Sequence, residues 1–191
     1  MITREEWLLS CIQELKPFFQ RVGHAIPDKV RASCSWPSKG ALSKKKRLGE
    51  AWSAELSGDQ HFETFISPVL QEPDDVMATL VHELVHCVVG VRNKHNKAFR
   101  ACAKRVGLVG KATATTAGPE LTDRLHTIFD KIGPYPHAEL HYFNAPPKQS
   151  TRMLVVKCPQ CDYQVRTTRK WLEIGIPTCC CGALMEHVAD D

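Results

Sequence analysis

The stretch LVHELVHCVVG, residues 80–90, decides how this chain folds. Apolar residues recur in it, and just before it at Val76, at the three- and four-residue intervals of an amphipathic helix. Asp74 or Asp75 is placed to cap the start of this helix, and Gly90 is placed to end it. The pattern therefore predicts a helix with one apolar face over about residues 74–89.

This helix contains the pattern H-E-x-x-H at His82, Glu83 and His86. Two histidines four residues apart lie on one face of a helix, so both imidazoles can bind one zinc ion. Glu83 lies about 100° further around the helix axis than His82, where it can reach a water on the metal without being a ligand. We therefore predict a catalytic zinc site with Glu83 as the general base. The alternative is a helix whose histidines face solvent or partners in the core.

A catalytic zinc site needs a third protein ligand. The metzincin spacing would require glycine at position 89 and histidine at position 92, but the chain has Val89 and Arg92, which excludes that class. His95 is the next histidine, and a chain that turns back after Gly90 could bring it to the ion. The rival ligand is a downstream carboxylate, of which Glu120 is the nearest.

The rest of the first two thirds of the chain predicts a short sheet and several helices. Strands are predicted at 29–36, 47–56 and 61–67, the last two joined as an antiparallel hairpin around the turn at 57–59. Further helices are predicted at 4–20, where Pro17 disturbs or ends the helix, at 96–106 and at 121–132. A short antiparallel sheet mostly followed by helices is an α+β fold.

Three segments together resemble the SprT-like metallopeptidases, the family that includes Spartan: ISP at 66–68, the helix at 76–86, and KHNKAF at 94–99. The resemblance covers roughly residues 5–132 and implies a zincin-like SprT domain. It further implies that His95 is the third ligand of the catalytic zinc and that Glu83 is the general base. Family members commonly have glycine after the third histidine, where this chain has asparagine. The best-studied relatives cleave proteins crosslinked to DNA.

The cysteines predict a second, structural zinc site near the C-terminus. Five of the nine cysteines fall in residues 158–181, as C-x-x-C followed by C-C-C-G. Two such pairs are typical of a zinc ribbon, in which four thiolates close a tetrahedral site. Similar ribbons in the SprT-like group usually end in C-x-C-G, so that Cys180 would not be a ligand. His187 is an alternative fourth ligand. The ligands favoured in this way are Cys158, Cys161, Cys179 and Cys181.

We expect three parts along the chain: a metallopeptidase domain at 1–133, a proline-rich linker at 134–150 and the zinc ribbon at 151–191. The four scattered cysteines are expected to be small buried apolar side chains rather than disulfides. They are Cys11, Cys34, Cys87 and Cys102. Because a signal-peptide pattern and a long apolar stretch are both absent, a soluble cytoplasmic protein without a membrane partner is expected.

Two groups of basic residues are candidates for nucleic-acid binding. The chain has a formal net charge of +4, and no acidic residue lies between Glu83 and Glu120. Cations of the predicted helix at 96–106 share one face, and a second group with an aromatic side chain lies on the hairpin of the predicted ribbon. Both groups, and the basic cluster at 44–47, could equally be solvated surfaces. The predicted nucleic-acid contacts are Lys97, Arg100, Lys104, Arg166, Arg169, Lys170 and Trp171.

The sequence thus predicts a zinc metallopeptidase with one catalytic and one structural zinc. Its substrate would be a protein or peptide, held as an extended strand at the edge of the sheet, and DNA, single-stranded or duplex, would be a further partner. The rival is a non-enzymatic nucleic-acid or transcription-associated binding module in which both zinc sites are structural. A hydrolase acting on a non-peptide bond would use the same residues.

Overall fold

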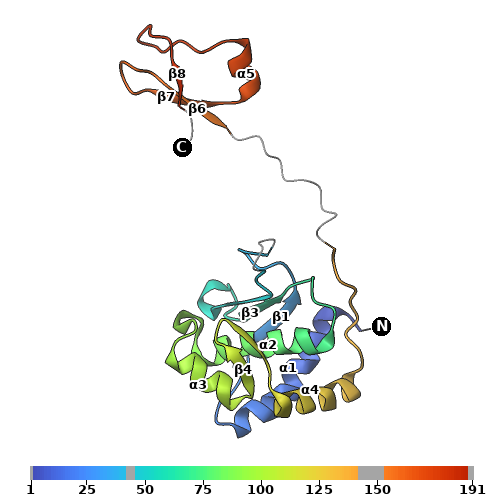
Figure 1. Cartoon of the computed structure of the whole chain (residues 1–191). Helices are drawn as coiled ribbons and strands as arrows, with labels where there is room; N and C mark the ends of the chain where they lie inside the picture. Colours follow the sequence, from blue (N-terminus) through green and yellow to red (C-terminus); the bar gives the residue numbers. More distant parts are fainter. Residues whose placement is uncertain (1, 42–45, 142–152, 189–191) are drawn as a thin grey trace. The chain divides into compact units, whose positions relative to one another are not determined.

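The computed structural model describes residues 2–41, 46–141 and 153–188. The chain divides into two compact units, Met1–Asn144 and Ala145–Asp191 (Figure 1). Each unit has a hydrophobic core of its own. Helices and small sheets are mixed, which confirms the predicted α+β class. None of the helices in the described part of the chain is both long enough and apolar enough to cross a membrane.

Three strands of the first unit form a mixed sheet in the order β1-β3-β2. β2 (Gly49–Trp52) and β3 (Phe62–Ile66) pair antiparallel, as predicted for this hairpin, with the 3-10 helix η1 (Ala54–Leu56) between them. β1 (Val30–Cys34) pairs with β3 in parallel, which corrects the expectation of an antiparallel sheet. The cause is topological: the chain passes from β1 to the far edge at β2 and returns through the centre as β3.

Helix α1 (Arg4–Arg21) begins with a capping box, in which Thr3 and Glu6 each accept a hydrogen bond from the other's backbone N–H. The helix continues through Pro17 instead of ending there. Pro17 is exposed, so the carbonyl that loses its N–H partner can bond to water. The buried face of α1 packs against β1 and against α4 (Pro119–Ile132).

Helix α2 (Pro73–Val89) is the helix that the sequence predicts from its apolar period, and it packs against β2 and β3. Its N-cap is Glu72, which makes no side-chain capping bond, so the prediction of an aspartate cap is wrong. Asp74 and Asp75 instead lie in the first turn, where carboxylates favour the positive end of the helix dipole. Gly90, with φ of 89°, ends the helix as predicted.

The chain after α2 forms further elements that pack against this helix. The short 3-10 helix η2 (Val91–Asn93) leads into α3 (Lys97–Arg105), which the sequence predicts. A two-stranded hairpin, β4 (Leu108–Lys111) with β5 (Ala114–Ala117), follows and was not predicted. The hairpin matters for function because β5 lies against α2.

The first residues of the predicted linker belong to the first unit. Tyr135 is buried, with its ring centroid 4.9 Å from that of Trp7. The backbone N–H of Leu140 donates to the carbonyl of Pro68, which fixes the chain further along. The remainder of the predicted linker lies outside the described residues, and so do Lys44 and Lys45 of the predicted basic cluster.

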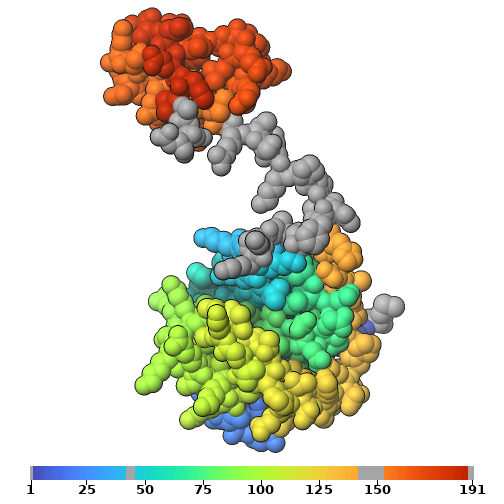
Figure 2. All heavy atoms as spheres, viewed as in Figure 1, coloured from blue at the N-terminus to red at the C-terminus, as the bar shows by residue number. Residues whose placement is uncertain are grey.

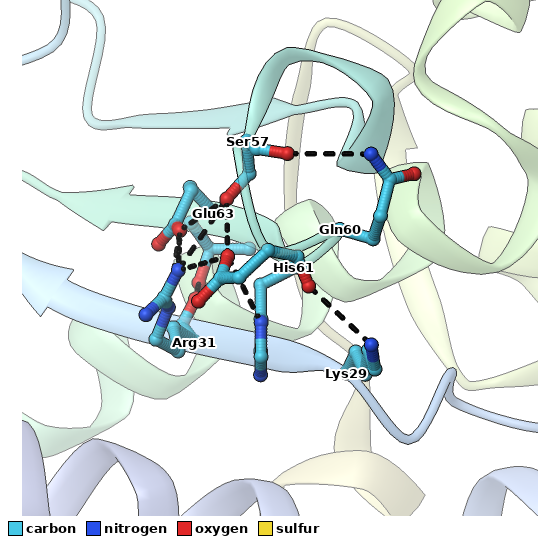
Figure 3. A network of polar contacts seen from close by, with 8 residues as sticks. Lys29, Arg31, Ser57, Gln60, His61 and Glu63 are labelled. Atoms are coloured by element: carbon cyan, nitrogen blue, oxygen red, sulfur yellow. Dashed lines mark hydrogen bonds and ion pairs between the residues drawn. The ribbon is translucent and has the colours of Figure 1, made fainter.

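A polar network ties the loop between β2 and β3 to β1 (Figure 3). The Arg31 guanidinium on β1 reaches the Asp59 carboxylate at 2.8 Å and the Glu63 carboxylate at 2.5 Å. Ser57 donates to Asp59 at 2.7 Å, and this hydrogen bond is the main reason why the pKa of Asp59 lies well below its ordinary value. These contacts anchor the loop to β1 and to the start of β3.

The second unit is a small three-stranded sheet in the order β7-β6-β8 with a short helix, α5 (Arg169–Ile174). β6 (Leu154–Lys157) pairs antiparallel with both β7 (Gln164–Thr167) and β8 (Glu186–Val188). The buried residues of its core among those described are Val156, Cys158, Cys179 and Met185. A core of this size cannot stabilise a domain by itself, so a cross-link or a metal is needed.

Candidate metal centre and active site

Three histidines of the first unit converge on one point. His82 and His86 project from one face of α2, and His95 joins them from the turn after η2. The Nε2 atom of His95 lies 3.1 Å from Nε2 of His82 and 3.3 Å from Nε2 of His86. Tetrahedral zinc with bonds of about 2.0–2.1 Å places two ligand nitrogens about 3.3 Å apart. The three imidazoles therefore have the spacing of a zinc site.

A tight turn brings His95 back to α2. The backbone N–H of Asn96 donates to the carbonyl of Asn93, which closes the turn. Inside it, Lys94 has φ of 47° and ψ of −131°, a conformation that residues other than glycine adopt at a cost in energy. Asn96 then caps α3 through its side chain. Glu120, the rival third ligand, is exposed in the first turn of α4 and is not among the groups that come together here.

The surroundings keep the imidazoles neutral. Burial, and to a smaller extent the charge of neighbouring imidazoles, lowers the pKa of His82 to about 4 and that of His86 to about 3. Burial also lowers the pKa of His95. The ring of Phe99 packs on the cluster, with its centroid 4.4 Å from that of His86. Neutral imidazoles with free lone pairs are the form in which histidine binds a metal.

One further side chain contacts His82, and the sequence does not predict it. The hydroxyl of Thr115, on β5, lies 2.8 Å from Nδ1 of His82. Because Nε2 of His82 points at the other histidines, Nδ1 is the nitrogen that donates to this hydroxyl. Such outer contacts fix the tautomer and ring orientation of a metal ligand. Nδ1 of His86 is also buried but has no hydrogen-bond partner among the described residues.

Glu83 lies beside the histidines and is 5% exposed. Burial raises the pKa of its carboxyl to about 8, although the nearby charge of Arg47 acts in the opposite direction. Strand β2 passes directly over this carboxyl at Gly49. A Cβ atom at position 49 would lie 2.5 Å from Oε1 of Glu83 and 2.7 Å from Cγ2 of Thr79, so only glycine fits there.

The histidines and Glu83 open into a cleft of about 510 Å³. One wall is β2 with the residues that precede it, another is the start of β5, and the floor is α2. The cleft thus joins elements that are far apart in the sequence. Residues that line it include Lys46, Arg47, Glu50, Lys94 and Thr115.

Four cysteines form a second cluster, in the second unit. The Sγ atoms of Cys158 and Cys181 are 3.4 Å apart, those of Cys161 and Cys179 are 3.5 Å apart, and those of Cys161 and Cys181 are 3.9 Å apart. Tetrahedral zinc with bonds of about 2.3 Å separates two ligand sulfurs by about 3.8 Å. This site fits zinc as well. Cys180 and His187, the alternative ligands, are exposed and outside the cluster.

The other cysteines and the predicted nucleic-acid contacts of the first unit lie outside the two clusters. Cys11, Cys87 and Cys102 are buried as predicted, whereas Cys34 is only half-buried. In Figure 2 the yellow-green segment around residue 100 lies at the surface of the first unit, and its three predicted cations are exposed: Lys97, Arg100 and Lys104.

The basic group of the second unit differs from the expectation of a hairpin surface. Arg166 lies on β7, but Arg169, Lys170 and Trp171 lie on α5. All four are exposed, and Lys170 Nζ is 5.1 Å from the centroid of the Trp171 ring. The aromatic face of this group therefore lies next to a cation of the chain itself.

Comparison of the chain with protein-family models, with curated proteins and with solved structures found no match. The SprT-like resemblance therefore rests on the motifs alone, and the case for a function rests on the chemistry of the two metal sites.

Proposed function

We propose that this protein is a zinc-dependent metallopeptidase with a zincin-like SprT domain. The observation that carries the proposal is the combination of three neutral imidazoles at tetrahedral spacing with a buried carboxyl group beside them, in an open cleft. A purely structural zinc site has no use for such a carboxyl group or for access from solvent. The four-cysteine cluster, by contrast, is closed and would hold a structural zinc.

Each residue of the site has its own role in the proposed reaction. When bound, zinc polarises the carbonyl group of the substrate and lowers the pKa of water. His82, His86 and His95 supply the lone pairs that hold it. Glu83 accepts the proton of the attacking water and later donates it to the leaving amine. Thr115 keeps the ring of His82 in position.

The cleft favours an extended peptide as substrate. β2 is an edge strand of the sheet, and Gly49 and Ala51 line the cleft beside Glu83. The outer backbone groups of an edge strand can pair with a peptide, whose scissile bond then lies across the histidines. A flexible segment of a protein is therefore a better substrate than a folded one.

We further propose that the substrates are DNA-associated proteins. The exposed cations of α3 and of the second unit support this substrate class. Such cations would bind phosphate and keep the enzyme near proteins on DNA. Binding to single-stranded or duplex DNA should then weaken steeply as salt is raised. A salt-independent affinity would contradict this part of the proposal.

The experiment that tests the activity compares zinc-loaded wild-type protein with Glu83→Gln. An unfolded protein and the enzyme itself serve as substrates, with and without single-stranded DNA. The variant keeps the three ligands, so its zinc content and circular dichroism should match the wild type while cleavage is lost. If folded, zinc-loaded wild type cuts nothing in either condition, the non-enzymatic binding module becomes the better account. Cleavage of an ester but not of a peptide would favour a non-peptide hydrolase.

A further inference from the structure

The charges in the cleft are unevenly distributed. Among the described residues that line it, the cations are Lys46, Arg47 and Lys94, and the carboxyl groups are Glu50 and Glu83. Glu83 is buried and acts on water in the proposed reaction, so it is no partner for the substrate's side chains. A bound zinc ion adds positive charge at the same place. The open part of the cleft is therefore suited to a negatively charged group.

Arg47 is held in this cleft by an ion pair with Glu50. Its Nη1 atom donates to Oε1 of Glu50 at 2.6 Å. Glu50 is itself fixed, because it accepts hydrogen bonds from the backbone N–H and the hydroxyl of Ser38 at 2.7 Å and 2.8 Å. The Glu50 side chain is only 12% exposed, so burial and the two bonds from Ser38 together hold the carboxylate that the guanidinium contacts.

The ion pair with Glu50 leaves part of the Arg47 guanidinium available for a further hydrogen bond. Arginine has five N–H donors in a planar fork, and the bond to Glu50 uses one nitrogen. Half of the Arg47 side chain remains exposed to solvent. Arg47 lines the cleft two residues before Gly49, where β2 passes over Glu83. A peptide held along β2 would therefore pass beside its free donors.

We propose that Arg47 binds a carboxylate of the substrate and makes the enzyme prefer peptides with an aspartate or glutamate next to the cleaved bond. The proposal rests on the proposed peptidase activity and names the substrate class of that same site. A pre-oriented guanidinium binds a carboxylate through two parallel hydrogen bonds, which an amide of similar size cannot match. Lys94 and Lys46 add long-range attraction without this geometry.

The test measures kcat/KM for a peptide series in which each position around the cleaved bond carries in turn aspartate, glutamate, asparagine, glutamine or lysine. A charged hydrogen bond should give one position at which the acidic residue exceeds its amide by about 10- to 100-fold. In Arg47→Gln this ratio should fall to about one, and in Arg47→Lys to an intermediate value. The matched control is Arg92→Gln, which removes the same charge from an ion pair with Glu55 outside the cleft, and should keep the wild-type ratio.

The outcomes separate this proposal from the one on which it rests. If zinc-loaded wild type cleaves no peptide, the peptidase activity itself is wrong. If it cleaves peptides but shows no acidic preference, or if folded Arg47→Gln and Arg47→Lys keep the full preference, only the role of Arg47 is wrong. Weaker DNA binding by Arg47→Gln, with an unchanged peptide ratio, would mean that the guanidinium binds phosphate and would also overturn the proposal. Because Arg47→Lys keeps the charge beside Glu50, this variant tests the proposal even if Arg47→Gln does not fold.

Discussion

At the scale of single residues, Thr115 is the side chain whose removal tests the orientation of the metal site most directly. Its hydroxyl accepts from Nδ1 of His82, and loss of such an outer contact lowers metal affinity by about 10- to 100-fold. Thr115→Val should therefore release zinc to a chelator at correspondingly lower chelator concentration. Thr115→Ser keeps the hydroxyl and should behave as wild type. Equal affinity in all three proteins would show that the contact has no influence on His82.

Lys94 has a backbone conformation that suits glycine, and its replacement should stabilise the first unit. Relief of strain at φ 47°, less the entropy that glycine adds to the unfolded chain, leaves a gain of about 1 kcal/mol. Lys94→Gly should thus raise the melting temperature by a few degrees, as measured by thermal unfolding. The control is Lys97→Gly, the same change at the first position of α3, which should be neutral or destabilising. A fall in the melting temperature of Lys94→Gly would contradict the argument.

Most residues of the two clusters could be predicted because their identities and local spacing carry the chemistry, whereas spacing alone left His95 and Glu120 open and the SprT-like resemblance favoured His95. His82 and His86 need only one helix to come together, and the cysteine pairs need only tight turns. Thr115 could not be predicted, because it reaches His82 through the pairing of β4 with β5 and the packing of β5 on α2. A threonine in a short polar stretch has no sequence pattern that distinguishes it.

At the scale of elements, the approach of β2 to α2 depends on Gly49. A methyl group at this position would overlap the Glu83 carboxyl, so Gly49→Ala must either displace β2 or rotate Glu83 away from the three histidines. A displacement of about 1 Å at a catalytic group can reduce the rate about 100-fold. We expect a loss of kcat/KM of this order with zinc content retained. Gly58→Ala is the control, because nothing lies within 4 Å of the added methyl group. Full activity of Gly49→Ala would contradict this account.

The sequence predicted elements with a strong period better than it predicted how strands pair. α2, α3 and α4 have clear apolar faces, and the β2–β3 hairpin has a recognisable turn. The parallel pairing of β1 with β3 depends on the chain crossing from β1 to the far edge of the sheet before it returns as β3. No local sequence pattern predicts such a crossing. β4, β5 and α5 are short, and exposed residues predominate in them, so their burial pattern is too weak to be recognised.

At the scale of the whole molecule, the two units have separate cores and separate clusters that could hold a metal, so they should respond separately to metal loss. The second unit buries little, and its fold should depend on zinc held by its four cysteines. Chelation, or Cys158→Ser, should therefore abolish the folded state of the second unit. The first unit has an extensive apolar core, and should keep its thermal transition in both cases.

The matched control for this prediction is Cys180→Ser. Cys180 lies outside the cluster, so this variant should keep both its zinc and the resistance of residues 153–188 to proteolysis, which Cys158→Ser should lose. Zinc content by mass spectrometry under native conditions, with limited proteolysis, measures both effects. In Cys158→Ser, peptide hydrolysis without DNA should persist, because its groups all lie in the first unit. If Cys158→Ser also unfolds the first unit, or if Cys180→Ser loses the ribbon zinc, the division of the chain into two independent zinc-binding parts is wrong.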